Sequence, residues 1–213
     1  MKRVTVLGSG PVAKVLASGL KTHGYEVRIG NRSPEKIAAF GKEAGIPTGT
    51  PAEAAAWADT VVLAVAGRAA EEALAGAGVA NLRGKIVIDT TNPIAGEPPV
   101  DGVLRFFTGP NDSLMERLQA AFPDARFVKA FNSVGNAVMV GPSFAGGKPT
   151  MFYCGNDAAA KADVARLIEQ FGWEGADMGT AVAARALEPL CQLWCIPGLR
   201  ENRWSHAFKL LRA

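Results

Sequence analysis

A glycine-rich turn near the N-terminus carries the clearest chemical signal in the sequence. The residues Gly8-Ser9-Gly10-Pro11-Val12-Ala13 follow a short apolar run, 3–7, and precede a helix-like segment that reaches about Thr22. In this G-x-G-x-x-A spacing the first glycine permits a tight turn, and the second lets the backbone approach a pyrophosphate. The free N–H groups at the start of the helix add a partial positive charge. The turn therefore predicts a dinucleotide-binding site.

The end of the next strand-like run, 26–29, indicates which dinucleotide binds. An NAD site usually places an acidic residue about 20 residues after the glycines, bonded to the ribose 2′-hydroxyl. This sequence has Asn31-Arg32-Ser33 there, and Arg32 can grip a 2′-phosphate with its planar fork while Ser33 adds a hydroxyl. The pattern favours NADP. The alternative is a solvated Arg32 in a site that takes NAD without a carboxylate.

Polar residues also follow later apolar segments, where parallel strands would end. Asn92 follows one of these segments, and Asn132-Ser133-Val134 follows another. Ligands of doubly wound sheets bind at the carboxyl ends of the strands, so both places are candidates for the nicotinamide end and the second substrate. Their amide and hydroxyl groups can hold a carboxamide or a ring carbonyl without supplying a charge. The alternative is that Asn92 merely ends a strand before Pro93, and that Asn132 merely turns the chain.

The sequence thus predicts two sets of binding residues and no catalytic acid, base or metal ligand. His23 is expected at a helix C-terminus and His206 in the last helix, both in structural roles. Glu188 is expected to pair with Arg185 on a helix surface. The predicted cofactor-binding residues are Gly8, Ser9, Gly10, Pro11, Val12, Asn31, Arg32, Ser33, Lys36, Ala64, Val65, Ala66, Asn92 and Pro93, and the predicted substrate-binding residues are Asn132, Ser133 and Val134.

The elements that must position these residues alternate between strand and helix. This alternation predicts an α/β fold, a Rossmann-type doubly wound and mainly parallel sheet. We expect residues 1–179 to form the NADP-binding domain. Ser33, Thr50, Ser113 and Asn156 are expected to cap helices. The expected strands are 3–7, 26–29, 59–65, 85–89, 126–131 and 150–154, and the expected helices are 11–22, 33–44, 50–57, 69–80, 114–122 and 156–171.

The last part of the chain, 180–213, is expected to be a short helical extension. One apolar stripe comprises Leu187, Leu190, Cys191, Trp194 and Cys195, with Pro189 marking a kink or a restart of the helix. Trp204, Phe208 and Leu211 form a second stripe at helical spacing. Such stripes are typical of core packing, but they also suit a subunit interface that closes the cofactor cleft. We therefore expect a homodimer.

Composition narrows the class of protein. The chain has 213 residues, 48% of them hydrophobic and 20% charged, which is ordinary for a globular domain. A net charge of +3 without a dense basic block argues against nucleic acid as a partner. No apolar run approaches the roughly 20 residues of a membrane span, so a cytoplasmic protein is expected. Three cysteines give no disulfide framework and are expected to pack as apolar residues.

Beyond these local signals, the sequence resembles the coenzyme F-420-dependent NADP oxidoreductases, whose partner is a deazaflavin. It is also similar to the cytosolic, NADPH-binding domain of metalloreductases. The departure is Ala66-Gly67-Arg68, where relatives often carry a proline and a bulky residue beside the cofactor. The resemblance covers nearly the whole chain and is carried by the segments Val6-Leu7-Gly8-Ser9-Gly10, Gly30-Asn31-Arg32-Ser33, Val87-Ile88-Asp89-Thr90-Thr91-Asn92-Pro93, Val128-Lys129-Ala130-Phe131-Asn132-Ser133-Val134, Tyr153-Cys154-Gly155-Asn156-Asp157, Ala184-Arg185-Ala186-Leu187-Glu188-Pro189-Leu190 and Ala207-Phe208-Lys209-Leu210-Leu211-Arg212.

The resemblance implies hydride exchange between NADP(H) and a deazaflavin. Hydride transfer between two rings needs alignment and exclusion of water more than a strong acid or base, which suits the few such groups in this chain. One alternative is an NADPH-dependent reductase of a flavin, quinone or metal chelate. Another is a non-catalytic NADP-binding sensor. In the enzymatic readings the partner is a small redox molecule.

Overall fold

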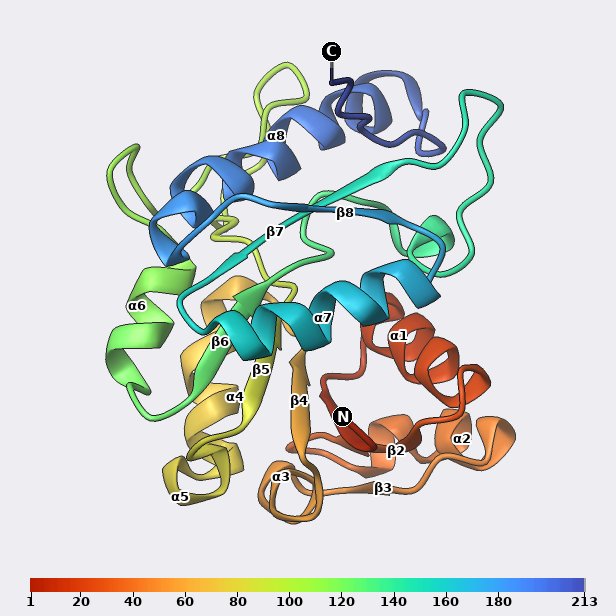
Figure 1. Ribbon diagram of the computed structural model, residues 1–213, viewed down its shortest axis with the longest axis vertical. Helices are drawn as coiled ribbons and strands as arrows, with labels where there is room; N and C mark the ends of the chain where they lie inside the picture. The colour runs from red at the N-terminus through yellow and green to blue at the C-terminus, as the bar shows by residue number, and fades with distance from the viewer. Residues whose placement is uncertain (213) are drawn as a thin grey trace.

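Most strands of the structure are segments that the sequence fills with β-branched and apolar residues. The computed structural model describes residues 1–212, which form an eight-stranded sheet in the order β3-β2-β1-β4-β5-β6-β7-β8 (Figure 1). The expected Rossmann-type sheet is confirmed. The strands are β1 Arg3–Leu7, β2 Glu26–Gly30, β3 Thr48–Gly49, β4 Thr60–Leu63, β5 Ile86–Asp89, β6 Arg126–Lys129, β7 Thr150–Gly155 and β8 Glu174–Asp177.

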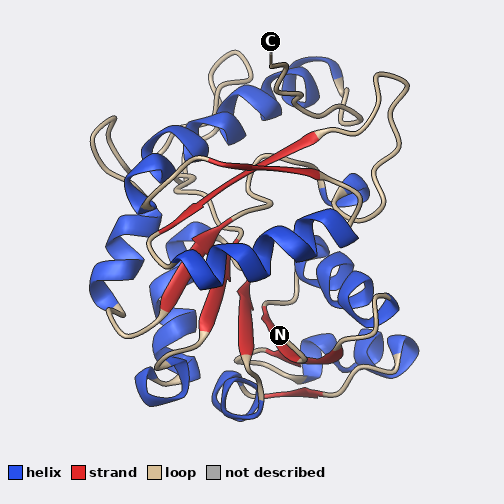
Figure 2. Cartoon of the chain, in the orientation of Figure 1, coloured by secondary structure: helices blue, strands red, loops and turns tan. Residues whose placement is uncertain are grey.

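Helices cover both faces of this sheet (Figure 2). Helices α1, α2 and α7 bury apolar side chains in one cluster, represented by Leu16, Ile37 and Val164. Helices α3, α4, α5 and α6 pack on the other cluster, which also receives Leu187 of α8. The helices are α1 Pro11–Thr22, α2 Glu35–Ala44, α3 Pro51–Trp57, α4 Ala70–Ala77, α5 Val79–Leu82, α6 Leu114–Ala121, α7 Ala158–Gln170 and α8 Ala184–Glu201, with short 3-10 turns at Gly67–Ala69, Asn136–Val138 and Ala181–Ala183.

The register of the sheet aligns the carboxyl ends of its parallel strands. Leu7 pairs with Gly30 and with Leu63, Leu63 pairs with Asp89, and Asp89 pairs with Lys129. The segments that follow β1, β2, β4, β5 and β6 therefore emerge side by side along one edge. The strand order changes direction between β1 and β4, which is the switch point where ligands of such sheets bind.

The far side of the sheet differs from a simple parallel array. Strand β7 runs antiparallel to β6, and β8 pairs parallel with β7. Strand β8 was not expected from the sequence, because Glu174-Gly175-Ala176-Asp177 contains no apolar run. Its place in the sheet comes from tertiary pairing and not from local propensity.

Two of the four expected helix caps are confirmed and two are wrong. Thr50 and Ser113 accept hydrogen bonds from the third residue of their helices. Helix α2 begins after Pro34 without a side-chain cap, and the Ser33 N–H donates to Asn31 Oδ1 at 2.9 Å instead. The next wrong cap is Asn156. Its neighbour Asp157 caps α7, while Asn156 Oδ1 accepts a bond from Ala181 N.

The C-terminal extension is only partly helical. Helix α8 runs without interruption through Pro189 and Pro197 to Glu201, and the next residue, Asn202, turns the chain with a left-handed φ of 54°. The expected second helical stripe is wrong, because residues 202–212 form no helix and return along α8. Trp204 and His206 lie against Trp194, with ring centroids 5.7 and 4.8 Å from it. Thr150 N donates to Phe208 O at 2.9 Å, so this segment also adds to the edge near β7.

The expected helix 69–80 divides at Gly78 into α4 and α5. Within residues 1–212, no helix is both long enough and apolar enough to cross a membrane.

Candidate functional site

The glycine turn after β1 is held close to β4. Gly8 has a φ of 140°, and a Cβ atom on it would lie 2.2 Å from the carbonyl oxygen of Ala64. Its N–H donates to Gly30 O at 3.1 Å, so the turn also contacts the end of β2. The fold itself therefore requires glycine at position 8.

Gly10 differs from Gly8, because no contact within the protein requires glycine at position 10. A Cβ atom on Gly10 would meet no atom within 4 Å. Gly10 precedes α1, which has Pro11 in its first turn, no side-chain cap and no acidic residue there. Open space beside an uncapped helix N-terminus fits a bound phosphate group. The residues around Gly10 thus fit the pyrophosphate of a dinucleotide.

The segment after β2 is ordered by backbone contacts. Asn31 N donates to Gly49 O at 3.0 Å, and Asn31 Oδ1 accepts from Ser33 N. Arg32 and Lys36 are exposed at the same edge. Arg32 Nη1 donates to Glu72 Oε1 of α4 at 2.8 Å, a partner that the sequence did not predict. The cation predicted to recognise a phosphate is thus held by a carboxylate from the far side of β1.

The segment after β4 forms a wall between the glycine turn and the next strand end. Ala64 is buried, Val65 is half-buried and Ala66 is exposed. Gly67 lies so close to the segment after β5 that a Cβ on it would be 2.0 Å from the Asn92 carbonyl oxygen. The wall therefore reaches from the glycine turn to the predicted nicotinamide end.

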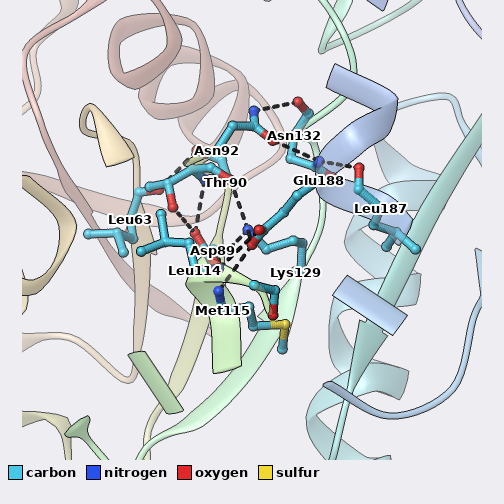
Figure 3. A network of polar contacts seen from close by, with 12 residues as sticks. Leu63, Asp89, Thr90, Asn92, Leu114, Met115, Lys129, Asn132, Leu187 and Glu188 are labelled. Carbon is cyan, nitrogen blue, oxygen red and sulfur yellow. Dashed lines mark hydrogen bonds and ion pairs between the residues drawn. The ribbon is translucent and has the colours of Figure 1, made fainter. Parts of the chain in front are cut away.

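Asn92 and Asn132 meet at that end as a pair of amides (Figure 3). Asn92 Nδ2 donates to Asn132 O at 2.7 Å, and Asn132 Nδ2 donates to Asn92 Oδ1 at 3.0 Å and to Leu187 O at 2.8 Å. Asn132 is only 4% exposed, and its neighbours Ser133 and Val134 are also buried. The structure thus brings together the Asn92 and Asn132 segments that the sequence grouped.

The residue before Asn132 is strained. Phe131 has a φ of 60°, in the left-handed region that a bulky residue rarely adopts, although it is almost fully buried. Its side chain packs against Phe171 with ring centroids 5.7 Å apart. Strain of this kind costs on the order of 1–3 kcal/mol and clusters at functional sites.

A buried ion cluster lies directly beneath the amide pair (Figure 3). Lys129 Nζ is 2.8 Å from Asp89 Oδ2 and 2.8 Å from Glu188 Oε1, and all three side chains are at most 1% exposed. Lys129 Nζ also donates to Thr91 O at 2.8 Å. Burial alone lowers the pKa of Lys129, but the two carboxylates outweigh it and raise the pKa above that of an ordinary lysine.

The sequence interpretation of Glu188 is wrong. Glu188 does not pair with Arg185. Its two oxygens accept from Leu114 N at 2.9 Å and Met115 N at 3.0 Å, the first amides of α6. Arg185 instead binds Glu116 through two hydrogen bonds of 2.9 and 2.8 Å. A lysine inside the apolar run Val128-Lys129-Ala130-Phe131 was the one available signal of a buried charge.

The cysteines are free thiols. Burial raises the pKa of Cys154 to about 12. Cys191 and Cys195 lie one helical turn apart with their sulfur atoms 4.0 Å from each other, and Cys195 is only half-buried. No group of three or more metal-ligating His, Cys, Asp or Glu side chains occurs in residues 1–212.

Two cavities flank the loop before α6, and neither contains a predicted binding residue. One, of about 340 Å³, is lined by Arg185, Glu188, Pro189 and Gln192 of α8 together with loop residues that include Phe106 and Asp112. The other, of about 350 Å³, is lined by Gly67, Arg68, Glu71, Phe107, Leu114, Arg117 and Leu118. The predicted dinucleotide residues lie along the open edge of the sheet instead.

Known proteins with this sequence pattern and this fold decide the family. The family described as NADP oxidoreductase, coenzyme F-420-dependent, matches residues 3–93. A candidate F-420-dependent NADP-reductase from Arthrobacter sp. FB24 has 34% sequence identity and a TM-score of 0.92, over 98% of this chain and 99% of that protein. The chain belongs to the coenzyme F-420-dependent NADP oxidoreductase family. It is an NADP-dependent oxidoreductase.

Other relatives of this NADP oxidoreductase share part of their length with it. Metalloreductase STEAP3 of Rattus norvegicus is 31% identical over 92% of this chain, which spans 38% of that relative's length. The imine reductase BcSIRED from Bacillus cereus has a TM-score of 0.67 at 20% identity, over 91% of this chain and 60% of its own. At that identity the likeness concerns the fold alone.

The buried cluster predicts a large loss of stability when its cation is removed. Lys129→Met would leave Asp89 and Glu188 as two buried carboxylates without a counter-charge. We expect the free energy of unfolding to fall by about 3–5 kcal/mol, the usual cost of breaking a buried ion pair from one side. Denaturant unfolding at neutral pH measures it.

The control is Lys209→Met, which removes a lysine from an exposed ion pair with Glu174. That change should cost under about 1 kcal/mol, as for other surface pairs. If the two variants lose equal stability, the cluster is not the buried charge pair described above.

Proposed function

We propose that this enzyme exchanges hydride between NADP(H) and a deazaflavin coenzyme of the F-420 type. The observation that carries the proposal is the uncharged Asn92–Asn132 amide pair beside the strained Phe131, at the sheet edge that also holds the glycine turn. An uncharged, largely buried surface suits a reaction that needs aligned rings and little water. The family description supports the same partner.

The residues assigned to the dinucleotide would act through charge and shape. The N-terminus of α1 would bind the pyrophosphate beside Gly10, and Arg32, Ser33 and Lys36 would bind the 2′-phosphate. The nicotinamide ring supplies or accepts the hydride when the cofactor is bound. The segment 64–66 would then form the wall behind it.

The residues assigned to the acceptor would orient it without transferring protons. Asn132 Nδ2 donates its two hydrogens to Asn92 Oδ1 and Leu187 O. Its Oδ1 is then available to accept a hydrogen bond from the molecule that receives the hydride. Lys129 is not a candidate acid, because its ammonium group already has three oxygen partners. Asn132, Ser133 and Val134 therefore serve as positioning groups in this proposal.

Helix α8 belongs to the proposed site and to a proposed subunit interface. Leu187 O fixes Asn132, so the extension after residue 180 would complete the wall of the NADP-binding domain. Leu193 and Leu199 of α8, with Val100 and Val103, are 40–56% exposed. Exposed apolar side chains of this kind support a homodimer that covers them.

A second candidate function is NADPH-dependent reduction of a flavin, quinone or metal chelate. The similarity to a protein named metalloreductase, over 92% of this chain, favours it. A non-catalytic NADP-binding sensor is the third candidate. The hydrogen bonds that Asn132 Nδ2 donates to Asn92 Oδ1 and Leu187 O favour it, because they give this residue a structural role without a substrate.

The deciding experiment offers NADPH and one acceptor at a time to the purified protein. We expect turnover with a deazaflavin, followed by its visible absorbance, at a rate well above that with free flavin, a quinone or a ferric chelate. Turnover with one of the latter and none with the deazaflavin would support the second candidate. Tight NADPH binding without turnover with any acceptor would support the sensor.

Gly10→Val tests the phosphate end. Because a Cβ on Gly10 meets nothing in the protein, the variant should keep its fold and its melting temperature. The side chain would occupy the space assigned to the pyrophosphate, so calorimetry should detect no binding of NADP or NAD. A folded variant with near-normal affinity would contradict the placement of the cofactor.

Arg32→Ala tests the choice of nucleotide. We expect NADP affinity to fall by roughly 1.5–3 kcal/mol, the usual value of a hydrogen bond to a charged group, while NAD affinity hardly changes. The matched control is Arg28→Ala within β2, the strand that Arg32 follows, because the Arg28 guanidinium lies over the Trp57 ring. An equal loss for both nucleotides in Arg32→Ala would refute the 2′-phosphate assignment.

A further inference from the structure

The ion pair between Arg32 and Glu72 joins elements on opposite sides of β1. Arg32 follows β2, Glu72 lies in the first turn of α4 after β4, and β1 lies between these two strands. The distance from Arg32 Nη1 to Glu72 Oε1 is 2.8 Å, across 40 residues of sequence. The pair thus spans the switch point of the sheet.

The fold does not depend on this pair. The side chains of Arg32 and Glu72 are 76% and 69% exposed, and ion pairs with such exposure contribute about 0–1 kcal/mol. Glu72 is also the only carboxylate that reaches Arg32 within residues 1–212. The Arg32–Glu72 ion pair is therefore weak enough for another anion to replace Glu72 at the guanidinium of Arg32.

We propose that Glu72 competes with the 2′-phosphate of NADP for Arg32 and so lowers the affinity for NADP but not for NAD. The proposal rests on the function proposed above, in which Arg32 binds that phosphate. A phosphate monoester carries a charge of about −1.5 to −2 and three acceptor oxygens, so it displaces a single carboxylate from a guanidinium. NAD has only a hydroxyl at this position and leaves the pair intact.

The exchange costs little on the side of Glu72. Its carboxylate is largely in water already, so release from Arg32 needs no buried charge. Each NADP that leaves is replaced at Arg32 by Glu72, and the competition therefore favours release of the bound nucleotide. Glu72 acts in this way as a residue that determines nucleotide affinity without a contact to the nucleotide.

The test is calorimetric titration of NADP and NAD into the whole chain carrying Glu72→Gln. We expect NADP to bind about two- to five-fold more tightly at low salt, the range that a surface ion pair supports, with NAD unchanged. The gain should shrink as salt screens the original pair. Glu71→Gln is the matched control, since Glu71 is the neighbouring carboxylate of α4 but lines the cavity with Arg68 and Arg117.

The double variant Arg32→Ala/Glu72→Gln separates competition from simple repulsion. In the Arg32→Ala background, Glu72→Gln should give no gain in NADP affinity, because there is no guanidinium for which Glu72 and the phosphate could compete. An equal gain with and without Arg32, or an equal gain in Glu71→Gln, would overturn the exchange and assign the effect to general charge. If Glu72→Gln gives no gain while Arg32→Ala still weakens NADP and not NAD, the exchange is overturned and the phosphate assignment stands. If Arg32→Ala weakens both nucleotides equally, the phosphate assignment fails and the exchange fails with it.

Discussion

A lysine ammonium group held out of water between two carboxylates is the interaction on which the carboxyl edge of this sheet depends. Lys129, Asp89 and Glu188 are almost completely buried, and an isolated charge in such a place would be very costly. The cluster is possible because β5, β6 and α8 each deliver one member. Glu188 carries the second negative charge, and the first amides of α6 bind it at the positive end of that helix.

The same cluster fixes the neutral surface above it. Lys129 also binds Thr91 O, next to Asn92, and α8 supplies both Glu188 to the cluster and Leu187 O to Asn132. The C-terminal helix is therefore part of the sheet edge and not an appendage to it. The strained backbone at Phe131 can persist because the cluster and the core packing around Phe171 determine the positions on both sides.

The two ends of the proposed site use opposite physics. At the phosphate end, Arg32, Lys36 and Glu72 are exposed, so charges can exchange partners at little cost. At the amide end, the buried charges are paired with one another, and in the proposed function the uncharged Asn92 and Asn132 form the surface that meets the acceptor. Recognition of a phosphate needs available charge, whereas hydride transfer between rings needs a dry and ordered surface. Gly8 and Gly10 differ in the same way: the fold requires glycine at position 8, whereas at position 10 only the pyrophosphate of the proposed function would require it.

The sequence alone determined the parallel strands β1, β2, β4, β5 and β6, the glycine turn and the edge at which the polar residues collect. These follow from local signals: apolar runs, Gly8 and Gly10 at a fixed spacing, and polar residues after each run, as at Asn92 and Asn132. Tertiary structure decided which charges meet. Local spacing pairs Glu188 with Arg185, but the strand order brings it to Lys129 and to Leu114, 74 residues away. Tertiary structure likewise brings Glu72 to Arg32. It also lets residues 202–212 pack along α8 in a non-helical conformation. The spacing of residues in the sequence indicates which side chains share a face of one helix or strand. It does not indicate which helices and strands become neighbours in the fold, and that decides the partner of each charge.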